Sequence, residues 1–418
     1  MARLNLFQKT MRVWDASMPY NAVHAVRVPG ALDRGKLRAA ICEALEGCGF
    51  PCRAEDLVLE DRREGERPEM ILEESVVAEL GRRFDGPDGN LPFRFFVIPE
   101  EDGRFILGLC YRHLVASGDS ICWLLGDIIL FYTGQGEEAR SPDARKAAPR
   151  GWAVLARHWR YLPGWAATLP RHLTQSQEYA RLTRRHQPGA RSRARVVAIP
   201  AEGMDWIEAA RKRSGATFHD VLLALVLIAI ADAVPGRFGH RRRKKIAVGS
   251  VVNIRHCCGP KFAGRFGLFL SLFAVSHPVP EGAAVDEVLS SIRKQTAEIK
   301  RRRLYLRNLF YLAAALAWRR FLSPARADGL YAKSFPLAAS VTSFSVDRVW
   351  GKQAGPAVDD YWRGVSASPA TPLVLSCTTH DGAAKVIVSW DDSVYTERDI
   401  DAFLQTFSGQ MTPAHSPS

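Results

Sequence analysis

Residues 103–125, with the sequence GRFILGLCYRHLVASGDSICWLL, decide the fold because two periodicities meet in them. The segment 104–111 is apolar, has the length of a strand and follows an Asp-Gly dipeptide, which favours a buried strand that begins after a turn. Apolar residues then recur at helical spacing over residues 121–129, which predicts a helix. His113 therefore lies near the switch from a strand to a helix.

The residues upstream of this stretch predict further strands and one helix. Residues 22–28 (AVHAVRV) have the composition of a strand, and residues 36–45 that of a helix, which Asp33 would cap. Residues 91–99 form another apolar run, and the short EEDG connection to residues 103–114 indicates a hairpin or two neighbouring strands.

The second half of the chain alternates strands and helices again. Strands are expected over residues 194–200, 244–255, 266–275 and 337–346, followed by a hairpin over 372–391 that turns at Asp381 and Gly382. Helices are expected over residues 202–215, 217–234, 285–303 and 396–407. Because each half mixes strands with helices and neither carries a Gly-rich phosphate loop, the sequence predicts an α/β fold built as α+β two-layer sandwiches.

A change in composition indicates where the chain divides. With 418 residues the chain is too long for one ordinary core, so two domains are expected. The segment 134–188 is rich in Arg, Pro and Trp, and Pro163 and Pro170 would interrupt its helices. We therefore predict an N-terminal domain over residues 1–189, with this basic linker at its end, and a C-terminal domain over 190–418.

The net charge of +13 is concentrated in three basic clusters, at residues 185–195, 239–245 and 300–307. Such clusters are often solvated faces, but their field also attracts phosphate-bearing cofactors, acidic carrier proteins and anionic membranes. No zinc-finger spacing or RNA-binding motif accompanies the charge, so we do not expect nucleic acid as a partner.

Two long apolar stretches are expected to pack within the protein. Residues 221–234 include Asp232 and are too short to cross a bilayer, so they predict a buried helix. Residues 304–322 are bracketed by arginines and contain aromatic residues, which also suits a helix at a membrane interface or over an apolar ligand. An amphipathic helix against the core is favoured, and peripheral membrane contact stays an alternative.

The eight cysteines show neither paired two-residue spacing nor a secretory signal upstream. This pattern favours reduced thiols in a cytoplasmic protein over a disulfide framework. The CGFPC segment, residues 48–52, has no histidine or second thiol pair at ligand spacing, so we expect no metal site.

The motifs along the chain, in their order, resemble the chloramphenicol-acetyltransferase-like superfamily. They are HLVASGDS, GATFHDVLLALVLIAI, VGSVVNIR, FGLFLSLF, SVTSFSV and DDSVYTERDIDAFLQTF. Within the superfamily the sequence is most similar to nonribosomal-peptide condensation domains and their stand-alone relatives, such as wax-ester-synthase-like acyltransferases. The resemblance covers nearly the whole chain and implies two subdomains in a V, with the active site in a channel between them.

The family's signature is a pair of histidines, three variable residues and Asp-Gly, usually with a serine two positions later. On the segment RHLVASGDS the first histidine falls on Arg112 and the second, catalytic one on His113. The glycine and the serine correspond to Gly118 and Ser120, but the aspartate is replaced by Ser117. The sequence therefore keeps the base and the glycine and loses the carboxylate.

The lost aspartate raises a question of charge pairing. In the family it pairs with an arginine, which the resemblance places at Arg255, and a buried arginine without a partner is unfavourable. Ser117 cannot supply the ion pair. Asp119, at the predicted start of the helix, could instead cap the helix, complement its positive end or reach Arg255.

The chemistry expected of His113 is general base catalysis. An imidazole with a pKa near ~6.5 is largely neutral at cytoplasmic pH and can accept a proton from an attacking hydroxyl or amine. The amide of Gly118 is a candidate oxyanion donor, and the resemblance adds the hydroxyls of Thr342 and Ser343. From spacing alone a histidine after a strand is more often a packed or capping residue, and it is the resemblance that favours catalysis.

Two other histidines are weaker candidates. His219 is expected in the first turn of the buried helix, as a polar group at the edge of the core. His256 stands beside Cys257 and Cys258, an arrangement that suggests a cysteine nucleophile but lacks an identifiable acid.

The sequence as a whole predicts an acyltransferase with His113 as general base. It would move an acyl group from a coenzyme A or carrier-protein thioester, through a pantetheine arm, to a hydroxyl or amine acceptor. No permanently bound cofactor is implied, because acyl-CoA or the phosphopantetheinyl carrier is a co-substrate. The alternative, since Ser117 replaces the aspartate, is a catalytically degenerate binding or scaffold module of the same fold.

Overall fold

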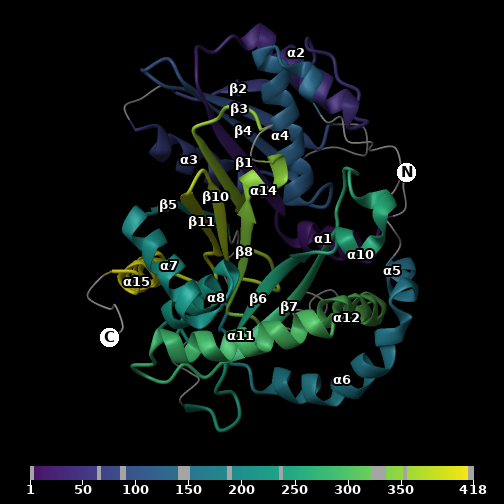
Figure 1. Ribbon diagram of the computed structural model, residues 1–418, viewed down its shortest axis with the longest axis vertical. Helices are drawn as coiled ribbons and strands as arrows, with labels where there is room; N and C mark the ends of the chain where they lie inside the picture. The colour runs from purple at the N-terminus through teal and green to yellow at the C-terminus, as the bar shows by residue number, and fades with distance from the viewer. Residues whose placement is uncertain are drawn as a thin grey trace.

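The computed structural model describes residues 4–63, 67–84, 91–139, 151–185, 191–234, 239–319, 321, 336–351 and 355–412. Their strands form two sheets, and helices cover both (Figure 1). The predicted α/β architecture of two sheets layered with helices is confirmed.

The first sheet has five strands in the order β2-β3-β4-β1-β9. They are β1 (Asn21–Val28), β2 (Leu59–Asp61), β3 (Phe93–Pro99), β4 (Phe105–Arg112) and β9 (Asp360–Val365). β1 lies in the interior and is antiparallel to both β4 and β9. The predicted strand over residues 22–28 and the predicted pairing of β3 with β4 are confirmed.

The second sheet has six strands in the order β5-β11-β10-β8-β6-β7. They are β5 (Ser192–Ile199), β6 (Ile246–Asn253), β7 (Leu270–His277), β8 (Ala339–Ser345), β10 (Leu373–His380) and β11 (Ala383–Asp391). The hairpin of β10 and β11 turns at Asp381 and Gly382, as predicted, and both of these residues have positive φ.

The helices flank the two sheets, and their order along the chain agrees with the sequence periodicity over most of its length. They are α1 (Leu6–Ser17), α2 (Arg34–Gly47), α3 (Pro68–Gly81), α4 (Gly118–Thr133), α5 (Gly151–Arg157), α6 (Leu162–Gln177), α7 (Ala201–Ser214), α8 (Phe218–Ala229), α10 (Arg255–Cys258), α11 (Val285–Arg301), α12 (Leu304–Arg319), α14 (Val346–Trp350) and α15 (Glu397–Gly409). Asp33 caps α2 as predicted, because its carboxylate accepts a hydrogen bond from the amide of Lys36.

One strand corrects the expectation that each half of the chain builds its own sheet. β9 comes from the second half, yet it pairs with β1 in the first sheet, with Ala22 opposite Val365. The predicted boundary between residues 189 and 190 falls just before β5, and the part that follows it contributes strands to both sheets. The boundary itself stays a prediction.

Three helices differ from expectation in extent or surroundings. α8 is buried as predicted but ends at Ala229, short of residue 234. Pro163 stands in the first turn of α6, whereas Pro170 lies inside that helix rather than ending it. α12 packs against β7 and α1, while Trp318 near its end is exposed. No helix in the described ranges is long and apolar enough to span a membrane.

The cysteines need one correction. Cys42 on α2 and Cys52 in the following loop form a disulfide, with a Cα–Cα distance of 5.1 Å, because the chain after α2 folds back along the helix. The expectation that all thiols are reduced is therefore wrong for this pair. The other six cysteines are free and buried.

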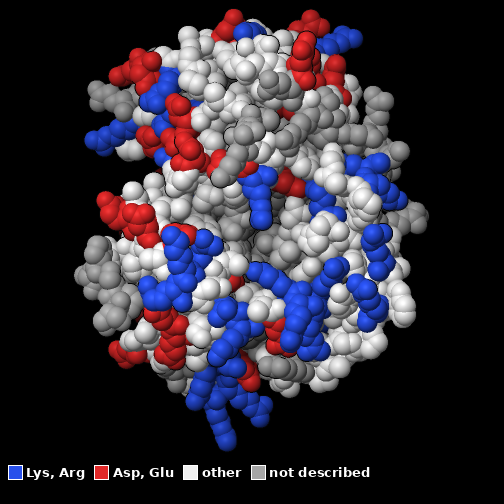
Figure 2. Space-filling model, viewed as in Figure 1, with Lys and Arg blue, Asp and Glu red and all other residues white. Residues whose placement is uncertain are grey.

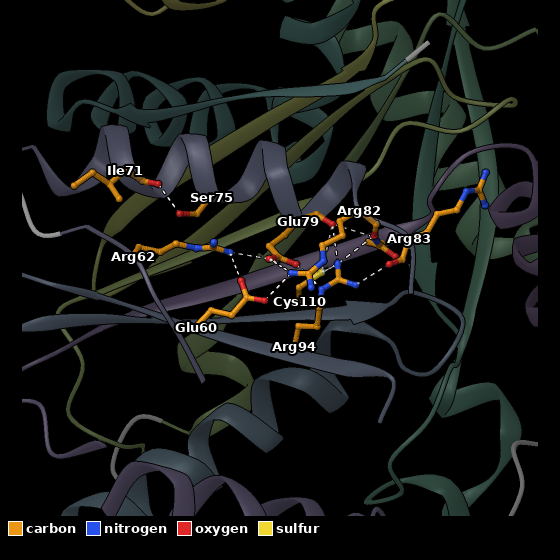
Figure 3. A network of polar contacts seen from close by, with 10 residues as sticks. Glu60, Arg62, Ile71, Ser75, Glu79, Arg82, Arg83, Arg94 and Cys110 are labelled. Atoms are coloured by element: carbon orange, nitrogen blue, oxygen red, sulfur yellow. Dashed lines mark hydrogen bonds and ion pairs between the residues drawn. The ribbon is translucent and has the colours of Figure 1, made fainter. Parts of the chain in front are cut away.

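An ion-pair network holds α3 against the first sheet (Figure 3). The buried carboxylate of Glu79 on α3 lies 2.6 Å from Arg94 Nε on β3 and 2.8 Å from Arg62 Nη2 beyond β2. Arg82 reaches Glu60 on β2 at 2.6 Å. Because several arginines share each carboxylate, the charge of the helix end is neutralised where it meets the sheet.

Candidate active site

His113 opens into a cavity of about 110 Å³ that both sheets and the first helix enclose. Its apolar wall comes from α1 (Phe7, Met11, Trp14), from β7 (Leu270, Leu272) and from Phe344, Val365 and Val374. Its polar lining gathers the residues of the signature and of the second sheet: His113, Ser117, Gly118, Asp119, Asn253, Ser340, Thr342, Ser343 and Arg363. The cavity thus brings together six of the predicted site residues from both halves of the chain, whereas Ser120 and Arg255 do not line it.

Two tyrosines and a backbone hydrogen bond position His113. The residue follows β4, and its amide donates to the carbonyl of Tyr20 at 3.1 Å. Its ring centroid lies 5.4 Å from that of Tyr20 and 5.8 Å from that of Tyr111, whose ring is nearly perpendicular. Packing on two sides restricts the plane of the imidazole, while its Nδ1 is buried without a hydrogen-bond partner among the described residues.

His113 is buried and neutral. Burial, and secondly the positive charge of Arg363, lower its pKa from the ordinary value of 6.5 to about 3, while backbone groups of Ala116 and His113 oppose the shift. The imidazole is therefore ready to accept a proton at neutral pH, but it is a weaker base than an exposed histidine.

The predicted ion pair between Asp119 and Arg255 is present. Asp119 Oδ2 accepts from Arg255 Nε at 2.8 Å and from the side-chain amide of Asn253 at 2.7 Å. The hydroxyl of Ser117 contacts the other carboxylate oxygen. Asn253 ends β6 and Arg255 lies two residues beyond it, whereas Asp119 lies in the first turn of α4, so the pair joins the signature segment to the second sheet.

Arg255 is saturated with partners, as a buried arginine should be. It donates through Nη2 to Ser120 Oγ at 2.8 Å and through Nη1 to the carbonyls of Phe262 and Arg265. Its guanidinium also lies over the rings of Trp123 and Phe269. Ser120, the counterpart of the signature serine, thus supports the arginine.

The three candidate oxyanion donors have different surroundings. Gly118 begins α4, and no side chain caps the first turn of that helix. Thr342 lies on the cavity wall, where its carbonyl and hydroxyl oxygens accept from Arg363 Nη2 at 3.1 and 3.0 Å. Ser343 also lines the cavity, but its hydroxyl is held by His219 Nδ1 at 2.8 Å.

Arg363 and His24 were missed by the sequence analysis. Arg363 lies on β9, directly opposite His24 on β1, and both side chains are buried. His24 Nδ1 contacts the hydroxyl of Tyr361 at 2.6 Å. A charged residue inside the otherwise apolar segment YWRGV was the available signal, but that segment was not predicted to be a strand.

The other candidate histidines are structural in their surroundings. His219 lies in the first turn of α8 as predicted and bridges Ser343 and Ser250, and burial lowers its pKa to about 4. Burial raises the pKa of Cys257 and raises that of Cys258 to about 12. Neither thiol is therefore prepared to act as a nucleophile beside His256.

The basic clusters lie partly on one face of the molecule. Figure 2 shows Lys and Arg gathered over the lower half of this face, where Figure 1 places α7, α8 and α11. The exposed cations of the predicted clusters are Arg185, Arg191, Arg193, Arg241, Arg242, Lys244, Lys300 and Arg301, and residues 186–190 lie outside the described residues. Within the described ranges, no group of three or more His, Cys, Asp or Glu residues could hold a metal ion.

Comparison with known proteins gives the fold a name. The first condensation domain of the calcium-dependent antibiotic synthetase, in complex with a substrate analogue, aligns over 100% of this chain and 97% of its own length, with a TM-score of 0.68 and 16% sequence identity. This is the condensation-domain fold. The expected resemblance is thus confirmed for the three-dimensional structure, although no family model and no curated protein matches the sequence.

Other solved structures are also similar to this chain over nearly its whole length. The condensation domain of the monacolin K polyketide synthase MokA aligns over 98% of this chain and 96% of its own, with a TM-score of 0.63 and 13% identity. The SgcC5 protein from Streptomyces globisporus aligns over 99% and 98%, with a TM-score of 0.62 and 16% identity. At such low identity these likenesses concern the fold alone.

Proposed function

We propose that this protein is an acyltransferase that moves an acyl group from a thioester to a hydroxyl or amine acceptor, with His113 as general base. One observation carries the proposal: in a condensation-domain fold, a buried neutral histidine opens into a largely apolar cavity beside the uncapped start of α4. Such a cavity excludes water, which would otherwise hydrolyse the thioester.

The proposed reaction proceeds without a covalent enzyme intermediate. His113 accepts the proton of the acceptor hydroxyl or amine as its oxygen or nitrogen attacks the thioester carbonyl carbon. The tetrahedral intermediate then collapses with cleavage of the carbon–sulfur bond. The departing thiolate takes up the proton from the imidazolium, so the products are an ester or amide and a free thiol.

The negative charge on the tetrahedral intermediate would be stabilised at the start of α4. The amide of Gly118 and the positive end of the helix are oriented before the reaction begins, which is what makes such donors effective. Thr342 is a second candidate because its hydroxyl lines the same cavity. Ser343 is the weaker candidate, since His219 already engages its hydroxyl.

The donor is proposed to be a carrier-protein or coenzyme A thioester. A second cavity of about 450 Å³ lies between α11, α12 and β7 and carries Lys245 and Arg307, and Leu272 lines both cavities. Cations beside such a cavity suit a phosphate-bearing pantetheine arm, and the exposed basic residues of Figure 2 suit an acidic carrier. The proposal needs neither a metal nor a permanently bound cofactor, and it places the protein in the cytoplasm.

Thiol release from acyl thioesters tests the proposal. We would offer short- and long-chain acyl-CoA and acyl-carrier thioesters with pooled alcohols and amines, and compare wild type with His113→Ala. Loss of the base should lower acceptor-dependent release by about 10²–10⁴-fold. The matched variant His240→Ala removes an exposed histidine outside both cavities and should leave the rate unchanged.

The same experiment decides against the proposal if His113→Ala retains the wild-type rate. Binding of thioesters without release from either donor type would instead support the alternative, a degenerate binding module in which Ser117 marks the loss of catalysis.

A further inference from the structure

Arg363 is the only buried arginine of the described residues that pairs with no carboxylate. Arg27, Arg255 and Arg363 are each at most 7% exposed. Arg27 pairs with Glu69, Glu100 and Asp360, and Arg255 pairs with Asp119. Arg363 Nη2 donates only to the carbonyl and hydroxyl of Thr342, and its Nε has no hydrogen-bond partner. Its guanidinium also lies over the ring of Phe344, 5.4 Å from the ring centroid, but no carboxylate of the described residues balances its charge.

The guanidinium of Arg363 lies against the start of α4. A Cβ atom built on Gly118 would stand 3.5 Å from Arg363 Cδ, 3.6 Å from Nη1 and 3.7 Å from His24 Cε1. The glycine therefore leaves open the space between the helix terminus, the arginine and His24. Because α4 has 16 residues and no side-chain cap, its first amides and its dipole add positive potential at the same point.

Two further observations indicate a polar occupant at this point. Arg363 lines the cavity that His113 opens into, so the position is accessible to a molecule bound there. His24 Nε2 is buried without a hydrogen-bond partner, although its other nitrogen is engaged by Tyr361. Buried donors and charges are normally satisfied by a protein group, a water or a ligand, and here an unsatisfied nitrogen stands beside an unpaired charge at an accessible cavity.

We propose that Arg363, the first turn of α4 and His24 form a subsite for a carboxylate carried by the substrate. The inference rests on the proposed function and names the class of substrate: an acyl donor or an acceptor with a carboxylate close to the reacting group. The oxyanion of the tetrahedral intermediate is the less suitable ligand for Arg363, because the neutral donors Gly118 and Thr342 can already stabilise it. The full positive charge of a buried guanidinium is best balanced by the full negative charge of a carboxylate.

The subsite also affects the base. Arg363 is one cause of the lowered pKa of His113, and an anion bound to the guanidinium would offset that charge. Binding of the carboxylate would therefore raise the basicity of His113 when substrate is present. Arg363 would thus position the substrate through its carboxylate and select for substrates that carry one.

The first experiment measures binding without turnover. We would follow the thermal unfolding midpoint with butyrate and with butyramide at fixed ionic strength, in wild type, Arg363→Met, Arg363→Lys and Arg348→Met. Butyrate, and not butyramide, should raise the midpoint of wild type and of Arg348→Met, which loses an exposed arginine by the same substitution. The effect should vanish in Arg363→Met and persist in part in Arg363→Lys, which also serves if the methionine variant does not fold.

Two pairs of probes then identify which substrate carries the carboxylate. Succinyl-CoA is compared with butyryl-CoA for the donor, and valine with valinamide for the acceptor. In one pair the member with the extra carboxylate, succinyl-CoA or valine, should bind at least about 10-fold more tightly to wild type, and Arg363→Met should remove that preference.

The inference is overturned if butyrate and butyramide act alike on wild type, or if the preference survives in Arg363→Met. It is also overturned if this variant slows charged and neutral substrates equally with unchanged binding, as an oxyanion donor would. Arg363-dependent carboxylate binding without any acyl transfer would retain the subsite and reject the proposed function, while transfer without carboxylate preference would do the reverse.

Discussion

Buried charges are paired on the flank of the first sheet, whereas the cavity beside it contains an arginine that pairs with no carboxylate of the described residues. On the flank, the carboxylate of Glu79 is shared by Arg62 and Arg94, and the charges compensate one another (Figure 3). In the cavity, Arg363 has neutral partners, the two oxygens of Thr342 and the ring of Phe344. Arg94 on β3 and Arg363 on β9 lie in the same sheet, so the difference is local. A fold that pairs its cations where they serve stability leaves one unpaired where a ligand can supply the missing charge.

The largest expected effect on stability comes from removing the carboxylate that pairs with a buried arginine. Asp119→Ala leaves Arg255 buried without its carboxylate, and we expect a loss of about 3–5 kcal/mol in the free energy of unfolding. Equilibrium urea unfolding measures it. Asp286→Ala, which breaks an exposed pair with Arg213, should lose less than about 1 kcal/mol. Equal losses in the two variants would show that burial of the pair is not what matters.

A smaller effect concerns the histidines beside the unpaired charge. Burial, and secondly the charge of Arg363, lower the pKa values of both histidines, and His113 further lowers the pKa of His24. Below pH ~6.5 the unfolded chain therefore binds protons at these two histidines that the folded protein does not bind. The contribution of the two neutral histidines to the free energy of unfolding is complete above pH ~6.5 and is lost as the pH falls.

Urea unfolding at pH 6.5 and 5.5 tests this linkage. His113→Gln should reduce the loss between these two pH values by about 1 kcal/mol, because one such group contributes that slope. His240→Gln, at an exposed position, should leave the loss as in wild type. An unchanged slope in His113→Gln would mean that the imidazole is protonated in the folded protein.

The smallest expected effect is the most informative for the comparison. Arg363→Met removes a buried charge that has no counter-charge, so the free energy of unfolding should stay the same or rise by about 1 kcal/mol. Arg255→Met, which strands Asp119, should be less stable than wild type. If Arg363→Met were destabilised as strongly as Arg255→Met, Arg363 would be a structural residue rather than a ligand-binding one.

The sequence predicted those parts of the fold where local periodicity and packing agree. The strand before His113, the cap at Asp33 and the hairpin turn at Asp381 and Gly382 are local features, and the structure contains all three. The pair of Asp119 and Arg255 could be predicted because the resemblance placed the arginine at Arg255, a buried arginine requires a partner, and Asp119 stands two residues after Ser117.

The sequence could not predict features that depend on distant segments. β9 is short and ends in the small-residue segment GVSAS, so its pairing with β1 is a tertiary effect. Because that strand was missed, Arg363 and its neighbour His24 were missed with it. The disulfide of Cys42 and Cys52 likewise depends on how the loop after α2 returns to the helix.

The return of β9 to the first sheet has a consequence for how the chain reaches its native state. The amide of Asn21 donates to the hydroxyl of Ser366 across 345 positions of sequence, so the sheet is completed only when nearly the whole chain has been synthesised. Until then β1 is an open sheet edge, prone to pair with other chains. A fragment cut at residue 189 would keep this edge and lack Arg363, so the two parts of the chain have to fold as one molecule for the cavity to exist.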